Sequence, residues 1–263
     1  MKNLVELSSE THKNLKVIEG SVFEAIKDQH VVNVQLNEAC IAAAHFPLFF
    51  MSDPKSDRMS LSAINSLEVN KNLFVEDGVW QSAYQPTIML TYPMRVMPAA
   101  DKKSQFTIGI DEENVAFSET EGTQLFESDG KASPYLSRIV KLIEADMQHE
   151  INTIQFCKEL NDLSLIAPAV IQVVYAQGKA HNLSGLYTID EKALENLDLE
   201  QLDGLRKKGY LASIYAILIS GYQLNLLLKK HNQVDGNETV NAVNMKLNKD
   251  DSETEKAAET PSA

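Results

Sequence analysis

Seven acidic residues crowd one polar stretch of the chain and are the first candidates for chemistry. They are Asp111, Glu112, Glu113, Glu119, Glu121, Glu127 and Asp129. Carboxylate oxygens are the ligands that calcium and magnesium prefer, and two carboxyls about 5–10 Å apart can divide acid and base roles in a hydrolase. The stretch has no DxDxDG run followed by a glutamate, so it does not match an EF-hand loop. The sequence favours a solvated acidic loop over either kind of site.

The other residue types that carry catalysis show no recognised spacing. The histidines form no HExxH or HxH pair, no serine lies in GxSxG, and no glycine pattern resembles a P-loop or a dinucleotide-binding turn. Cys40 and Cys157 lie far apart among apolar neighbours and without CxxC spacing, so both are expected to be small buried side chains. The sequence therefore predicts no catalytic residue, no cofactor and no metal ligand, and favours a protein that is not an enzyme.

Aromatic residues gather around a hairpin predicted at Asp77-Gly78. Aromatics on a hairpin can form a platform for a partner, although more often they anchor a small sheet to its core. In the acidic loop, Leu125 and Phe126 are the only apolar pair, and we expect them to pack into the core while the acids face outward. The candidate partner-binding surface combines both features: Trp80, Tyr84, Tyr92, Glu121, Phe126, Glu127 and Asp129.

The composition and charge of the chain disfavour some classes of binding partner. The 263-residue chain is 44% apolar, which is ordinary for a globular protein with a sizeable core. Its net charge is −13, with 24 basic against 37 acidic residues, which argues against binding nucleic acid or an anionic membrane surface. The N-terminus has no continuous apolar segment behind its first lysine, so it predicts no standard secretory signal and a cytoplasmic location.

The order of elements indicates an α+β fold, with a mainly antiparallel sheet covered by a long central helix and a C-terminal apolar helix. Short strands broken by turns fill the first hundred residues. Ser133-Pro134 then predicts a helix start, with serine as the cap, and apolar residues at helical spacing continue to about Leu160. Two strands around Gln177-Gly178, two short helices and a final apolar helix follow.

The final apolar helix and the tail pose separate questions. The stretch from Gly209 to Leu228 is uncharged and long enough to span a bilayer, but its buried amides and hydroxyls favour a core helix, so integral membrane insertion is not expected. Residues 233–263 are polar, acidic and poor in aromatics, which predicts a disordered tail. We expect a single domain over residues 1–232.

Four stretches together resemble one family. They are "NLFVEDGVWQSAYQPTIMLTYPM", "SETEGTQLFESDGKASPYL", "LSGLYTIDEKALENL" and "LRKKGYLASIYAILIS". With the opening "LVELSSETHKNLKV", they resemble the bacterial SapC family over roughly residues 1–230. That family is known for a member associated with a paracrystalline surface layer, and it offers no established catalytic residues to carry over.

The resemblance implies a non-enzymatic structural or interaction protein at the surface layer or envelope, with a protein or cell-envelope partner and a location at the cell surface. Two alternatives remain open from the residues. One is a soluble cytoplasmic accessory protein that binds a basic or aromatic peptide on the hairpin and the acidic loop. The other is an enzyme that uses the acidic loop with a divalent metal ion.

Overall fold

The computed structural model describes residues 4–53, 58–98 and 106–247. These residues form an α+β fold that contains the predicted long helix and the predicted C-terminal apolar helix. The chain divides into two compact units, each built from three separate segments. Unit 1 comprises residues 1–27, 75–81 and 85–149, and unit 2 comprises residues 28–74, 82–84 and 150–263. The prediction of a single domain over residues 1–232 stays a prediction.

Unit 1 is built from short strands and turns around a small core. One three-stranded sheet has the order β1-β9-β8 (Val5–Glu6, Phe106–Ile110, Arg95–Pro98), and another has the order β10-β2-β11 (Phe117–Ser118, Lys16–Val17, Thr123–Gln124). The unit also contains two short helices, α1 (Ser21–Ile26) and α3 (Thr87–Leu90). The predicted hairpin is present as β6 and β7 (Val75–Glu76, Val79–Trp80), because both turn residues, Asp77 and Gly78, adopt positive φ.

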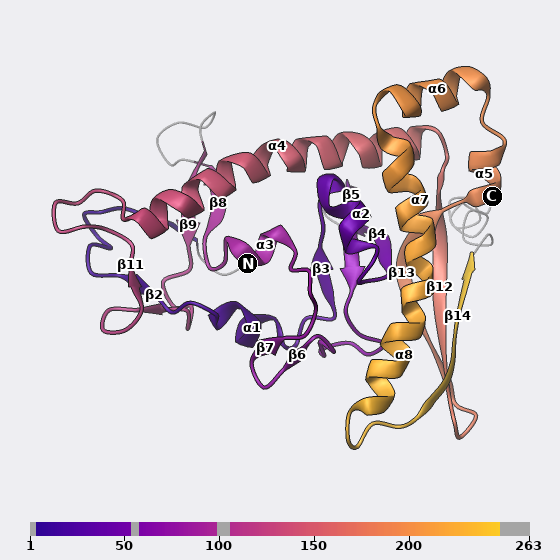
Figure 1. Ribbon diagram of the computed structural model, residues 1–263, viewed down its shortest axis with the longest axis horizontal. Helices are drawn as coiled ribbons and strands as arrows, with labels where there is room; N and C mark the ends of the chain where they lie inside the picture. The colour runs from indigo at the N-terminus through magenta and orange to yellow at the C-terminus, as the bar shows by residue number, and fades with distance from the viewer. Residues whose placement is uncertain (1–3, 54–57, 99–105, 248–263) are drawn as a thin grey trace, which may run out of the picture. The chain divides into compact units, whose positions relative to one another are not determined.

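Unit 2 is organised by one antiparallel sheet of order β14-β12-β13-β4-β5-β3 (Figure 1). Its strands are β3 (Val31–Asn33), β4 (Leu48–Asp53), β5 (Arg58–Ile64), β12 (Ile166–Tyr175), β13 (Ala180–Ile189) and β14 (Val240–Leu247). Three strands thus come from the first part of the chain and three from the last. The two halves meet where β13 pairs with β4, at Leu186 opposite Met51 and Tyr187 opposite Phe50.

Short helices complete unit 2. They are η1 (Leu36–Glu38), α2 (Ala39–Ala42), α5 (Glu191–Glu195), α6 (Leu199–Lys207), α7 (Tyr210–Ser220), η2 (Gly221–Gln223) and α8 (Leu224–Gln233). Helix α7 contacts β13 and β4, and helix α8 contacts β14. Phe49 and Phe50, consecutive residues of β4, point to opposite faces of the sheet, and both are buried, as are Leu61 of β5 and Ile214 and Ile217 of α7.

The long helix α4 (Pro134–Asp162) begins where the sequence predicts. The Ser133 hydroxyl accepts a hydrogen bond from the Leu136 N–H at 3.1 Å and donates one to the Gln124 carbonyl at 2.7 Å. The apolar residues predicted at helical spacing are buried in the first part of α4, at Leu136, Ile139 and Ile143. Ile151, further along the helix and at the same spacing, is exposed. In the second part of the helix the buried ring is Phe156, which packs edge-on against Tyr210 at 5.0 Å.

The predicted final helix is interrupted by the turn η2 and extends further, to Gln233. Over Tyr210–Gln233, a stretch of 24 residues, it is long and apolar enough to cross a membrane, and its most apolar window has a mean hydropathy of 1.6. Of that window, 33% is buried within the protein. The polar side chain of Ser220 is satisfied, because it donates to the Ile217 carbonyl at 2.6 Å and accepts from the Leu48 N–H at 2.9 Å.

Two sequence-based predictions need correction. Disorder from residue 233 onward is wrong over Val240–Leu247, where β14 forms an edge strand whose backbone pairs with β12; residues 248–263 lie outside the described part of the chain. Pairing with a buried neighbouring strand orders this polar segment despite its composition. Cys40 is also exposed rather than buried, since α2 turns Ala39 and Ala42 inward, whereas Cys157 is buried as predicted.

Candidate functional site

The three aromatic residues of the predicted platform are divided between the two units. Trp80 stacks on Phe23 within unit 1, with ring centroids 6.3 Å apart and planes 13° apart. The Tyr92 hydroxyl donates to Asn114 Oδ1 at 2.8 Å, also within unit 1. Tyr84 belongs instead to unit 2. These contacts are those of residues that anchor a hairpin and a loop, and the predicted role in partner binding stays a prediction.

The acidic loop is pinned as the sequence predicts. Leu125 and Phe126 are 0% and 8% exposed, and both join the core cluster of unit 1 with Leu136 and Ile139. Phe126 therefore lies in the core and does not form part of an exposed surface. Main-chain hydrogen bonds hold the loop as well, because Glu127 N–H donates to the Lys131 carbonyl at 2.8 Å.

Three acids of the stretch, Glu121, Glu127 and Asp129, are exposed, whereas Glu112 pairs with the buried ring of His12 at 2.8 Å. Asp129 pairs with Lys131 at 2.7 Å, a bond that lowers the pKa of the Asp129 carboxyl. Within the described residues, no three histidine, cysteine, aspartate or glutamate side chains lie close enough to hold a metal ion. The divalent-metal alternative therefore finds no such group in this part of the chain.

A buried carboxylate in unit 2 was not found from the sequence. Glu38 is buried and accepts hydrogen bonds from the Tyr84 hydroxyl and, at 3.1 Å, from the Gln35 N–H. Burial, and then the bond to Glu38, raise the pKa of Tyr84. The Ser82 hydroxyl lies 3.3 Å from His45 Nδ1, and the His45 ring stacks near Tyr84. Residues 82–84 are therefore tied to Glu38 and His45 of unit 2 by the side chains of Ser82 and Tyr84.

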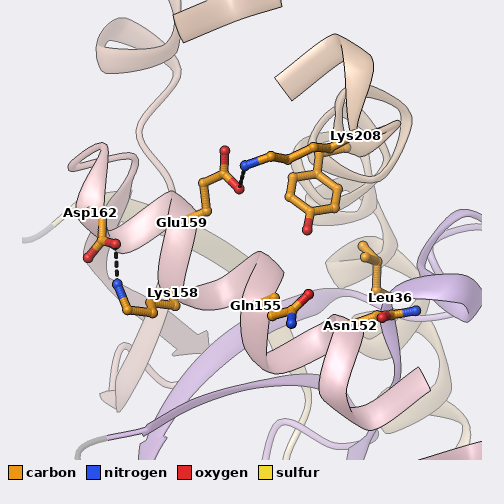
Figure 2. A pocket seen from close by; sticks show the side chains of 8 residues that line it. Leu36, Asn152, Gln155, Lys158, Glu159, Asp162 and Lys208 are labelled. Carbon is orange, nitrogen blue, oxygen red and sulfur yellow. Dashed lines mark hydrogen bonds and ion pairs between the residues drawn. The ribbon is translucent and has the colours of Figure 1, made fainter. Parts of the chain in front are cut away.

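Unit 2 also contains an open pocket of about 680 Å³ (Figure 2). It is lined by Leu36 of η1, by Lys208 at the end of α6, by Tyr210 at the start of α7, and by one face of α4: Asn152, Gln155, Lys158, Glu159 and Asp162. Its four charges form two ion pairs, Lys158 with Asp162 and Lys208 with Glu159, the latter at 2.6 Å. The bond to Glu159 raises the pKa of Lys208.

The pocket can offer neutral polar contacts. Among the described residues, neither the Tyr210 hydroxyl nor the Gln155 amide makes a hydrogen bond, and each can both donate and accept. Since the four charges form two pairs, the walls of the pocket carry no net charge. Sequence reasoning missed this pocket because its walls come from three segments far apart in the chain, and only the helical spacing of Asn152, Gln155 and Glu159 could have indicated a shared face.

The second exposed feature is apolar. Tyr215, Ile219 and Tyr222 are 50%, 63% and 77% exposed and follow one another at helical spacing on α7 and η2; we call them the apolar stripe. No charged residue lies between Gly209 and Leu228. Exposed apolar surface of this kind, when contiguous, marks sites that contact proteins or membranes.

Comparison with known proteins gives one result. A family model described as SapC matches residues 7–227. No curated protein and no solved structure matches the chain. The matched region includes most of unit 1, the part of unit 2 that precedes residue 228, the acidic loop, the pocket and the apolar stripe. Because the match extends over well more than half of its length, the chain belongs to the SapC family.

Proposed function

We propose that this SapC-family chain is a non-enzymatic interaction protein that acts at the surface layer or cell envelope by binding a protein partner. The observation that carries the proposal is the apolar stripe, Tyr215, Ile219 and Tyr222, on a protein of net charge −13. Exposing three large apolar side chains costs solubility, and a partner that covers them removes that cost. Tyrosine is also among the residues enriched where binding energy concentrates.

The opposite face of the same helix favours docking over insertion. Ile214 and Ile217 are buried, and Ser220 donates and accepts within the fold. A helix that spans a bilayer would have to release this face from the sheet. We therefore expect the stripe to contact a partner while the helix stays in place, with nucleic acid disfavoured by the charge.

Localisation in the native bacterium tests the proposal. A tag after residue 263 is followed by protease shaving of intact cells and by an alkaline wash of membranes. We expect the tag to be shaved, and the protein to leave the envelope fraction when Ile219→Ser and Tyr222→Ser are combined. Val115→Ser is the matched control, because Val115 is an apolar side chain 72% exposed in unit 1. A soluble, protected tag would refute the envelope role, and resistance to the alkaline wash would indicate insertion.

The pocket favours a second candidate, a soluble cytoplasmic protein that binds a peptide. A peptide main chain offers both donors and acceptors, which the Gln155 amide and the Tyr210 hydroxyl can meet, while Glu159 and Asp162 could exchange their lysines for basic groups of the ligand. Calorimetric titration with a Lys-Trp-Lys tripeptide tests this. Binding that Gln155→Ala weakens and Gln201→Ala, on exposed α6, leaves unchanged would support it, and absence of heat would refute it.

A further inference from the structure

Among the described residues, strand β14 forms one edge of the unit 2 sheet. It is eight residues long, which exceeds the usual strand length of about 5–6, and it carries one charged residue, Lys246, and no proline. In the described residues it pairs only with β12. Long edges without protection are templates for another strand, and proteins usually block them with proline, charge or bulges. The ladder of β14 with β12 has one register shift, between Val240 and Ala242, and it is regular from Ala242 to Leu247.

The direction of the backbone groups along β14 follows from its neighbours. In an antiparallel ladder, the N–H and C=O of one residue point to the same side, and the side alternates along the strand. Tyr175 N–H donates to the Lys179 carbonyl on the β13 side, and Ala176 N–H donates to the Thr239 carbonyl on the β14 side. Even-numbered residues of β12 therefore face β14.

The pairing register shows which residues of β14 direct their backbone groups toward β12 and which direct them away from it. Val174 pairs with Ala242, Gln172 with Asn244 and Val170 with Lys246, so these three β14 residues direct their backbone groups inward. Val243 and Met245 consequently direct theirs outward. Within the described residues, no main-chain partner lies beyond them.

At one end of this outer edge, the backbone N–H and carbonyl of Val240 are already hydrogen-bonded to a side chain. Asn232 Nδ2 donates to the Val240 carbonyl at 2.8 Å, and Asn232 Oδ1 accepts from the Val240 N–H at 2.8 Å. The register shift between Val240 and Ala242 resets the alternation, so Val240 faces outward, as Val243 and Met245 do. The Asn232 amide thus takes the place of a neighbouring strand at Val240. The open part of the edge is Val243–Leu247, and nothing comparable caps it in the described chain.

We propose that β14 pairs antiparallel with β14 of a second copy of this chain, in a register centred on Asn244, so that the sheet continues across a twofold axis. In this register Val243 of each copy lies opposite Met245 of the other, and their outward N–H and C=O groups form about four main-chain hydrogen bonds. The pairing is isologous, because one surface serves both copies.

The side chains of β14 complement themselves in that register. Met245, 40% exposed, faces Val243 of the second copy, and Lys246 faces Ala242, so no like charges oppose each other although each chain carries −13. The two Asn244 side chains meet on the axis, where one amide can donate to the other. Met245 also lies close to η2, because a methyl group at Gly221 would meet the Met245 Cε at 3.8 Å. In the dimer, η2 of each copy would therefore lie beside the paired β14 strands.

Sedimentation equilibrium of the full chain over a range of micromolar concentrations tests this pairing. We expect a monomer–dimer equilibrium whose dissociation constant rises about tenfold or more in Met245→Pro, because proline removes an outward N–H from each copy. The inner ladder loses nothing, so circular dichroism should be unchanged. Met245→Leu, which keeps the N–H and the apolar side chain, should dimerise like the wild type.

A charge exchange tests the register without touching the backbone. Asn244→Asp and Asn244→Lys each place like charges on the axis and should weaken the dimer, while an equimolar mixture of the two should restore it. A wild-type chain that stays monomeric, or a dimer indifferent to Met245→Pro, would overturn the proposal. A dimer weakened by Met245→Pro but unaffected by both Asn244 variants would overturn the register. None of these outcomes depends on the apolar stripe or on the envelope.

Discussion

At the scale of single residues, the two cysteines differ in reactivity because they differ in burial. Burial raises the pKa of Cys157 to about 12, so its thiol stays protonated at neutral pH, while Cys40 is exposed on α2. We expect a thiol reagent to label one site rapidly in the native protein and two in denaturant. Cys40→Ser is the control: rapid native labelling of that variant would show that Cys157 is accessible.

Phe126 makes the second prediction at this scale. Because it is 8% exposed within the core cluster, Phe126→Ala should lower the free energy of unfolding by about 3–5 kcal/mol, measured by chemical denaturation. Val115→Ala, in the same unit but exposed, should change it by less than about 0.5 kcal/mol. Equal effects of the two substitutions would contradict the pinning of the acidic loop.

At the scale of elements, the cap of α4 carries a prediction. The Ser133 hydroxyl is buried and serves both the Leu136 N–H and the Gln124 carbonyl. Ser133→Ala should therefore cost about 1–2 kcal/mol of unfolding free energy. Asp198→Ala, which removes the exposed cap of the shorter α6, is a suitable comparison and should cost less. Amide exchange in the first turn of α4 should quicken only in Ser133→Ala.

Elements with a strong local signal could be predicted from the sequence. Ser133-Pro134 marked the start of α4, Asp77-Gly78 marked the hairpin, and the uncharged run marked α7. Strand β14 could not be predicted, since its sequence, VNAVNMKL, does not alternate between apolar and polar residues, and the segment is ordered by pairing with β12. The pocket and the Glu38–Tyr84 contact could not be predicted from the sequence either, because each joins segments that only the fold brings together.

At the scale of the whole molecule, the two units are interleaved in sequence, and α4 contributes to both. Trp80, the single tryptophan, lies in unit 1, so its fluorescence follows that unit, whereas far-ultraviolet circular dichroism follows both. We expect the two signals to give the same denaturation midpoint, as in a two-state transition, because neither unit is a continuous piece of chain. Separate midpoints would mean that the units unfold independently, and a Trp80→Phe variant would confirm the origin of the fluorescence.

The split sheet of unit 2 has a consequence for synthesis on the ribosome. Strands β3, β4 and β5 are complete by Ile64, but β13, which pairs with the other edge of β4, is not finished until Ile189. At translation speeds of about 5–20 residues per second, β4 waits on the order of ten seconds with its edge unpaired. During that interval the nascent chain displays Phe49 and Phe50, which the finished protein buries completely. We expect a holding chaperone to bind ribosome-attached chains that end between these two points and to release those that extend past β13.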